Sequence, residues 1–136
     1  MVGSRPGRGA AVRDMAKILL AEDDESLRLF LARALTRAGH AVTDCGDGAV
    51  ALRHLQAPDA EYDLLLADIV MPGMDGIELA RRGADALPGL RVLFITGFAA
   101  VALHARRTGP HGDAKVLSKP FHLRDLVEQV DRILAA

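Results

Sequence analysis

Four apolar runs of the sequence end in polar residues of the kinds that handle phosphate and metal ions. In chain order these residues are Glu22 with Asp23 after KILLA, Asp68 after DLLLA, Thr96 after RVLFI, and Ser118 with Lys119 after AKVL. Carboxylate oxygens suit a hard cation such as Mg²⁺, while a hydroxyl and an ammonium neutralise phosphoryl oxygens. The set therefore predicts phosphoryl-transfer chemistry beside a magnesium ion.

The chemistry also predicts how these residues divide the work. Three carboxylates at one place would not stay ionised together without a cation. Magnesium usually takes one or two carboxylates with water and phosphate oxygens, which leaves another carboxylate free to act as a nucleophile. Asp68 stands alone at the end of its run, so we expect it to accept the phosphoryl group. The metal at Glu22 and Asp23, the Thr96 hydroxyl and the Lys119 ammonium would flank that group.

The apolar runs alternate with helical patterns, which predicts an α/β fold built on a buried parallel sheet. The predicted strands are 17–21, 40–45, 63–67, 91–95 and 114–117. Because ligands bind outside the carboxyl ends of strands in such sheets, all of the polar residues above would share one edge. We also expect the Lys119–Pro120 peptide to be cis, which would aim the lysine inward.

Apolar residues at helical spacing predict the helices that cover this sheet. The first pattern runs from Leu27 to Leu35 with Gly39 placed to end it, and the last runs from Leu123 to Leu134. The fourth helix, AAVALHARR at 99–107, has a weaker pattern and is followed by Gly and Pro. Residues 1–14 have no periodicity and are expected to form a disordered extension before a single domain at 15–136.

Composition excludes several classes of function. The chain has 136 residues, is 50% hydrophobic and carries a formal net charge of -1, so nothing favours direct binding to nucleic acid. No apolar run is long enough to span a membrane. The single cysteine, Cys45, allows neither an internal disulfide nor a zinc cluster, and a cytoplasmic location is expected.

Each candidate residue also has a purely structural interpretation. An Asp after a strand is often a helix cap, Thr is common in strands, and Lys-Pro often opens a loop. The combination in this order favours function. For the histidines (His40, His54, His104, His111 and His122) the structural interpretation is preferred, with side chains facing solvent or capping helices. Cys45 is expected to be a small core residue.

The segments ILLAEDD, LLLADIVMPGMDG, FITG and LSKPF make residues 17–135 similar to the receiver domain of two-component response regulators. This resemblance implies a flavodoxin-like, doubly wound (βα)5 sheet in the order 2-1-3-4-5, and a switch rather than an enzyme. It assigns the phosphoacceptor to Asp68 and the metal ligands to Glu22, Asp23, Asp68 and the backbone carbonyl of Val70. Thr96 and Lys119 would be the switch hydroxyl and the phosphate-binding lysine, with Mg²⁺ as the cofactor.

Longer stretches, including YDLLLADIVMPGMDGIELAR and VLSKPFHLRDLV, resemble the CpdR group of single-domain regulators. That resemblance implies phosphorylation by a histidine kinase or a histidine phosphotransfer protein. It also implies that the unphosphorylated form binds the ClpX unfoldase as an adaptor for ClpXP proteolysis. A phosphorelay shuttle with no protease partner needs the same site and stays an alternative.

One position departs from the residue that is usual in the family, and two others bear on the lifetime of a phosphoryl group on Asp68. Family members usually have Tyr or Phe where this chain has Val116, which puts the usual coupling of Thr96 to an aromatic rotamer in question. Val70 and Phe98 are apolar and cannot orient an attacking water, so we expect slow self-dephosphorylation.

Two other classes of protein share this architecture and fit the sequence poorly. Haloacid-dehalogenase-like phosphatases resemble D-x-D-G-[TV] at the first strand, whereas this chain has AEDDES there. A flavin-binding protein would need a phosphate loop rich in Gly, Ser or Thr after that strand, and none follows.

Overall fold

The computed structural model describes residues 15–98, 101, 104–105 and 114–136. The centre of the fold is one sheet of five parallel strands. They are β1 (Lys17–Ala21), β2 (Ala41–Cys45), β3 (Leu64–Asp68), β4 (Arg91–Thr96) and β5 (Lys115–Ser118). The strand order is β2-β1-β3-β4-β5. The predicted flavodoxin-like order is confirmed, and each strand lies within one residue of its predicted bounds.

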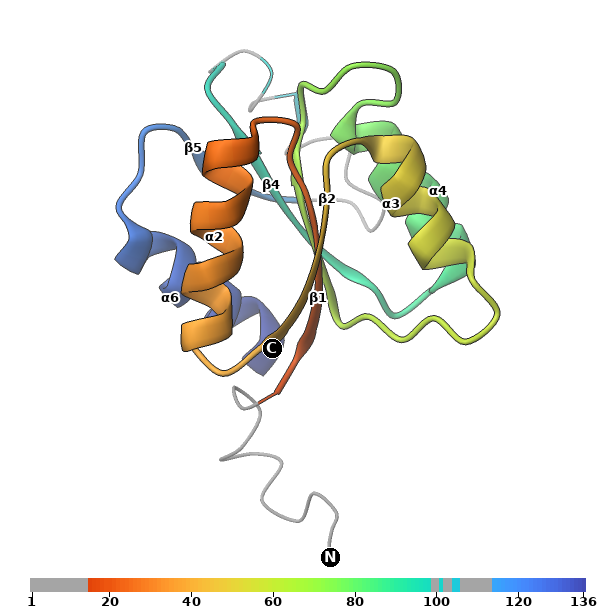
Figure 1. Cartoon of the computed structure of the whole chain (residues 1–136), viewed down its shortest axis with the longest axis horizontal. Coiled ribbons are helices and arrows are strands. Elements are labelled where there is room, and N and C mark those ends of the chain that lie inside the picture. The colour runs from red at the N-terminus through yellow and green to blue at the C-terminus, as the bar shows by residue number, and fades with distance from the viewer. Residues whose placement is uncertain (1–14, 99–100, 102–103, 106–113) are drawn as a thin grey trace, which may run out of the picture.

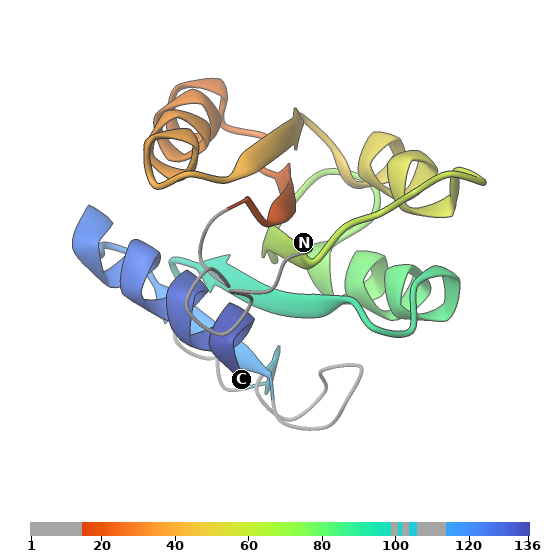
Figure 2. The same ribbon diagram turned by 90° about the horizontal axis from the view of Figure 1, so that it is seen from below.

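Helices cover both faces of this sheet, as a doubly wound fold requires (Figures 1 and 2). Those of the described residues are α2 (Glu25–Arg37), α3 (Gly48–Gln56), α4 (Gly76–Ala86) and α6 (Leu123–Ala135). Figure 1 shows α2 and α6 on one side of the sheet and α3 and α4 on the other. The fourth predicted helix, at 99–107, and the predicted extension at 1–14 fall largely or wholly outside the described residues.

The core lies on both faces of the sheet because successive strand residues point to opposite sides. Ile18 and Leu20 pack on the side of α2 and α6, whereas Leu19 and Ala21 pack on the side of α3 and α4. Every residue of β3 is buried. The central strand is therefore held from both sides, which fixes the position of the polar residues at its end.

Aspartate caps start three of the helices immediately beyond the carboxyl edge of the sheet. Asp24, Asp47 and Asp75 each accept a hydrogen bond from a backbone N–H three residues on, at 3.1, 2.8 and 2.8 Å. Such caps satisfy N–H groups that the first helical turn leaves without partners. They fix where each strand-to-helix connection ends and therefore shape the edge that carries the candidate site.

Gly39 ends α2 as predicted, and the residue after it departs from the prediction. The φ of Gly39 is 103°, and His40 N donates to Leu35 O at 3.2 Å, which together form a Schellman-type end. His40 was expected to face solvent or to cap a helix, and this is wrong. Its side chain is 4% exposed, and its Nδ1 accepts a hydrogen bond from Ala16 N at 3.3 Å. His40 directly precedes β2, and its bond to Ala16 holds the buried imidazole beside the start of β1.

None of the helices in the described part of the chain is long and apolar enough to cross a membrane.

Candidate functional site

Backbone hydrogen bonds extend the sheet by one residue at its carboxyl edge and hold the candidate residues there. Glu22 N donates to Cys45 O at 3.1 Å, and Lys119 N donates to Thr96 O at 2.8 Å. Asp68 lies opposite Ile95 in the β3–β4 register. The residues that follow or end β1, β3, β4 and β5 are therefore aligned, as the sequence predicted from the ends of its apolar runs.

Three carboxylates gather at this edge. Each of Glu22, Asp23 and Asp68 offers one oxygen such that all three oxygens lie within 4.8 Å of one another. Glu22 and Asp68 are buried, at 0% and 6% exposure, while Asp23 is exposed. An all-oxygen cluster with one solvent-facing member fits a hard cation that keeps part of its water shell. The residues present thus fit a magnesium ion.

Lys119 joins the two buried carboxylates. Its Nζ lies 3.1 Å from Asp68 Oδ2 and 3.5 Å from Glu22 Oε1. Burial by itself lowers the pKa of Lys119, but the hydrogen bond and charge of Asp68, followed by those of Glu22, raise it above its ordinary value. The lysine is therefore firmly a cation. The peptide that follows it, Lys119–Pro120, is cis as predicted.

The Glu22 carboxylate is held in an environment that disfavours its charge. Burial, together with the charge of nearby Asp68, raises its pKa to about 7, although the Asp24 N–H and Lys119 act in the opposite direction. The Asp24 N–H donates to Glu22 Oε2 at 3.1 Å. The single positive charge of Lys119 does not fully compensate the negative charges of the buried pair and of Asp23 beside it. A divalent cation at the cluster would stabilise their ionised forms.

The backbone around Asp68 is tightly packed and partly bonded to its side chain. Val70 N donates to Asp68 Oδ1 at 3.1 Å. On the α4 side, a Cβ placed on Gly76 would lie 2.4 Å from Asp68 O, so only glycine fits this close approach. Val70 itself is 48% exposed. Asp68 therefore presents Oδ2 to Lys119 while Oδ1 is held by its own loop.

Thr96 ends β4 as a fully buried residue whose hydroxyl is already engaged. Its Oγ1 accepts a hydrogen bond from Phe98 N at 3.2 Å, and the Phe98 side chain is 59% exposed. Val116 is partly buried and packs against the core on the α3 and α4 side. The large exposed ring near Thr96 is thus on Phe98, on the loop after β4.

Sequence reasoning missed an arginine that supports the site. Arg28, in the second turn of α2, donates from Nη1 to Glu22 O at 2.9 Å and from Nε to Asp44 Oδ2 at 3.0 Å. A Cβ on Gly46 would lie 3.2 Å from this Nη1. Parallel pairing of β1 with β2 sets Leu20 opposite Asp44. That register was the available signal, because it places Asp44 near the end of β1.

Cys45 and His122, which were predicted to have structural roles, do have such roles in the fold. Cys45 is 4% exposed, and burial, aided by Asp44 and Asp47, raises the pKa of its thiol to about 11. It is a core residue, as predicted. His122 stands at the N-cap of α6, where its backbone N–H donates to Asp125 Oδ2 at 3.4 Å.

Comparison with known proteins agrees with this geometry. The family model described as "Response regulator receiver domain" matches residues 18–131. The chain is 57% identical to the response regulator receiver protein CpdR of Brucella abortus over 122 residues, covering 90% of this chain and 99% of that protein. It is also 34% identical to the sensor kinase CckA of the same organism, but spans only 12% of that kinase.

Solved structures give the same result. A response regulator receiver protein from Sinorhizobium medicae superposes with a TM-score of 0.80 at 34% identity, covering 90% of this chain and 96% of the other. The receiver domain of the hybrid histidine kinase CckA superposes with a TM-score of 0.72 at 30% identity, over 87% and 98% of the two chains. With the family model covering most of its length, the chain belongs to the response regulator receiver domain family.

Proposed function

We propose that this protein is a single-domain response regulator that accepts a phosphoryl group on Asp68 from a histidine kinase or a histidine phosphotransfer protein. The observation that carries the proposal is the position of Lys119 Nζ, within 3.5 Å of both Glu22 and Asp68 beside a cluster of acidic oxygens. We assign the receiver domain to 15–136 and treat 1–14 as an extension outside it.

The transfer forms a bond from an Asp68 carboxylate oxygen to phosphorus as the bond from phosphorus to the donor's histidine nitrogen breaks. The electron pair of the broken bond stays on the imidazole, which takes up a proton. In this proposal Lys119 then pairs with the phosphoryl oxygens in place of Asp68 Oδ2, and the Thr96 hydroxyl donates a hydrogen bond to them. In this proposal Glu22, Asp23, Asp68 and the Val70 carbonyl hold Mg²⁺, which when bound neutralises charge on the phosphoryl oxygens.

We further propose that the protein acts as an adaptor for ClpXP proteolysis in its unphosphorylated form, and that phosphorylation ends this role. The support is its 57% identity to CpdR across nearly the full length of both chains. The adaptor role is thus transferred from a relative, and the site described above supplies only the switch that controls it.

Titration against the N-terminal domain of ClpX tests the adaptor role. The unphosphorylated protein and the Asp68→Ala variant should both bind, and binding of the unmodified protein should be lost with Mg²⁺ and beryllofluoride, a stable phosphoryl mimic. The Asp68→Ala variant should keep binding under the same conditions, because it has no carboxylate to hold the mimic. Absence of binding in every state, while Asp68 still accepts phosphate, would overturn the adaptor role.

Absence of ClpX binding in every state, with Asp68 still accepting phosphate, would favour a phosphorelay shuttle. The similarity to the receiver domain of a hybrid histidine kinase supports this candidate, because such a domain needs the same acidic cluster, threonine and lysine. The shuttle would return its phosphoryl group to a histidine phosphotransfer protein. Loss of label from the phosphorylated protein, with matching gain by that protein, is the measurement that distinguishes it.

A further inference from the structure

Arg28 connects the loop after β1 to the end of β2, at the edge of the sheet that carries the acidic cluster. Its Nη1 donates to Glu22 O at 2.9 Å, and its Nε donates to Asp44 Oδ2 at 3.0 Å. The side chain comes from α2, which lies beside both strands (Figure 1). One guanidinium therefore joins three elements at the place where the candidate metal ligands follow β1.

The guanidinium of Arg28 has little freedom to move. Its side chain is 17% exposed, and a Cβ on Gly46 would lie only 3.2 Å from Nη1. Because the guanidinium is planar, its two hydrogen bonds fix its plane as well as its position. The carboxylate of Asp44 also offsets part of its positive charge. Arg28 thus provides a rigid contact that carries little net charge together with its partner.

Within the described residues, Asp23 is the one member of the acidic cluster whose carboxylate has no hydrogen bond or ion pair. It is also the exposed member. Glu22 and Asp68 differ, because Lys119 pairs with both of them. Since side-chain rotamers depend on the backbone that carries them, the direction of the Asp23 carboxylate depends on the peptides on either side of it.

Two hydrogen bonds hold these peptides, one on each side of Asp23. After Asp23, Asp24 N donates to Glu22 Oε2 at 3.1 Å. Before Asp23, the peptide that joins it to Glu22 is bonded through Glu22 O, and Arg28 supplies the donor. No other donor among the described residues reaches this carbonyl. Loss of Arg28 would free the peptide to rotate and the Asp23 carboxylate to turn away from the cluster.

The charge of Arg28 acts in the direction opposite to its contacts. A cation beside an acidic cluster disfavours the binding of a divalent cation, even where Asp44 offsets part of the charge. Removal of the charge alone should therefore strengthen Mg²⁺ binding, whereas removal of a positioning contact should weaken it. The sign of the change in Mg²⁺ affinity separates the two effects.

We propose that Arg28, held in place by Asp44, is a positioning residue for Mg²⁺, because it fixes the peptide before Asp23 and so directs the Asp23 carboxylate toward the metal. This inference rests on the proposed function, which requires Mg²⁺ at the acidic cluster. Residues that orient metal ligands without touching the metal typically account for about 10–100-fold in metal affinity. Arg28 orients one ligand of several, so its loss should have an effect near or somewhat below the lower end of this range.

An amide NMR titration of the full-length, unphosphorylated protein with Mg²⁺ alone tests the proposal. Arg28→Gln should bind Mg²⁺ at least about fivefold more weakly than the unmodified protein, while its amide spectrum stays that of a folded chain. Arg33→Gln is the matched control, because Arg33 is an exposed arginine of the same helix without a hydrogen bond or ion pair in the described residues. It should change the affinity by less than about twofold in about 0.15 M salt. A smaller loss in Arg28→Gln, tighter binding, or an equal loss in Arg33→Gln would overturn the proposal.

Arg28→Lys decides the matter if Arg28→Gln does not fold. Lysine keeps the charge, but its ammonium ends one atom short of Nη1 and lacks the fork that reaches Glu22 O and Asp44 together. This variant should bind Mg²⁺ at least about threefold more weakly, and a smaller loss would overturn the proposal. If the unmodified protein binds no Mg²⁺, the proposed function fails together with this inference. If the unmodified protein binds Mg²⁺ and the Arg28 variants bind it as tightly, only the inference fails.

Discussion

Lys119 is the residue on which the candidate site depends most, because it is the one cation within reach of two buried carboxylates in the described part of the chain. Without it, Glu22 and Asp68 would repel each other in a region where water screens little. Its raised pKa reflects these two contacts despite partial burial. The lysine therefore stabilises the two buried carboxylates, and in the proposed reaction the same ammonium group would bind the phosphoryl oxygens.

We predict that Lys119→Gln slows phosphorylation by acetyl phosphate about a hundredfold, because a preorganised charge at the transferring group is lost. The rate is measured by phosphate-affinity electrophoresis. Lys115→Gln serves as the control, since Lys115 is an exposed lysine at the far end of the same strand. An unchanged rate in Lys119→Gln would remove the lysine from the reaction.

The lifetime of the phosphoryl group should be set by Val70 and Phe98, which are both substantially exposed and apolar. Neither side chain offers an atom that orients a water, so the phosphorylated protein should persist for minutes or longer in magnesium buffer. A Phe98→Glu variant should lose the group about tenfold faster because a carboxylate accepts a proton from the attacking water. A lifetime of seconds for the phosphorylated, unmodified protein would contradict this prediction.

Cys45 gives a simple test of the core. Because burial and the neighbouring Asp44 and Asp47 raise the pKa of its thiol to about 11, the thiol stays protonated at pH 8. Only the thiolate reacts with iodoacetamide. We predict no labelling of the native protein and complete labelling in guanidinium chloride, measured by mass spectrometry. Equal labelling rates in both conditions would mean that Cys45 is accessible in the native fold.

At the scale of the elements, the connection from β3 to α4 positions Asp68, the proposed phosphoacceptor. Gly76 begins α4 directly against the backbone of Asp68, and Gly76 N donates to Ile69 O at 2.9 Å. The loop between them turns through Gly73, whose φ is 75°. The start of α4 is thus held directly against the end of β3.

A Gly76→Ala variant should lower the free energy of unfolding by about 1–3 kcal/mol, because the new Cβ would overlap with Asp68 O. Urea denaturation measures this. Gly89→Ala is the matched control, since a Cβ on Gly89 meets no atom within 4 Å and should be close to neutral. Equal stability of the two variants would show that the close approach can relax freely.

These elements also show why the sequence predicted the strands well. Runs such as KILLA and DLLLA are apolar throughout, which is typical of strands buried on both faces, and the structure has them within one residue of the prediction. Helix ends were predictable where Gly39 provided a local signal. His40 was misjudged because its burial depends on how the chain enters β2, and no local pattern carries that information.

At the scale of the whole molecule, parallel strands bring residues far apart in the chain to one edge. The meeting of Glu22, Asp68 and Lys119 could be predicted because each residue ends a strand or directly follows one. For Arg28 the β1–β2 register indicated only that Asp44 lies near the end of β1. The bonds of Arg28 to Glu22 O and Asp44 depend on how α2 lies over the edge, which the register does not give.

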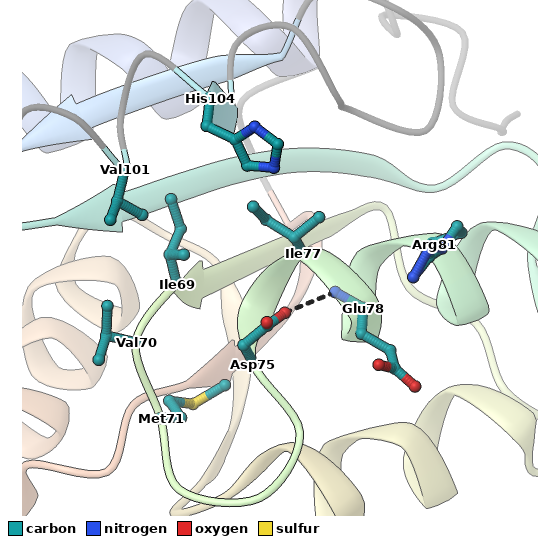
Figure 3. A pocket seen from close by; sticks show the side chains of 9 residues that line it. All are labelled: Ile69, Val70, Met71, Asp75, Ile77, Glu78, Arg81, Val101 and His104. Atoms are coloured by element: carbon teal, nitrogen blue, oxygen red, sulfur yellow. Dashed lines mark hydrogen bonds between the residues drawn. The ribbon is translucent and has the colours of Figure 1, made fainter.

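The two faces of the sheet also differ in how completely side chains fill them. The α2 and α6 side is filled by core side chains from the strands, while the α3 and α4 side adds a hollow lined by Ile69, Val70 and Ile77, which begins one residue after Asp68 (Figure 3). The hydrogen bond from Val70 N to Asp68 Oδ1 joins Asp68 to the loop on that side.

The proposed function requires Asp68 to accept a phosphoryl group in a magnesium-dependent reaction. Intact-mass analysis after incubation with a phosphorylated histidine phosphotransfer protein measures this directly, with and without Mg²⁺, for the unmodified protein and for Asp68→Asn. We expect a single phosphoryl group on the unmodified protein, only when Mg²⁺ is present, and none on the variant. Phosphorylation of Asp68→Asn to the same extent, or none of the unmodified protein with Mg²⁺ present, would contradict it.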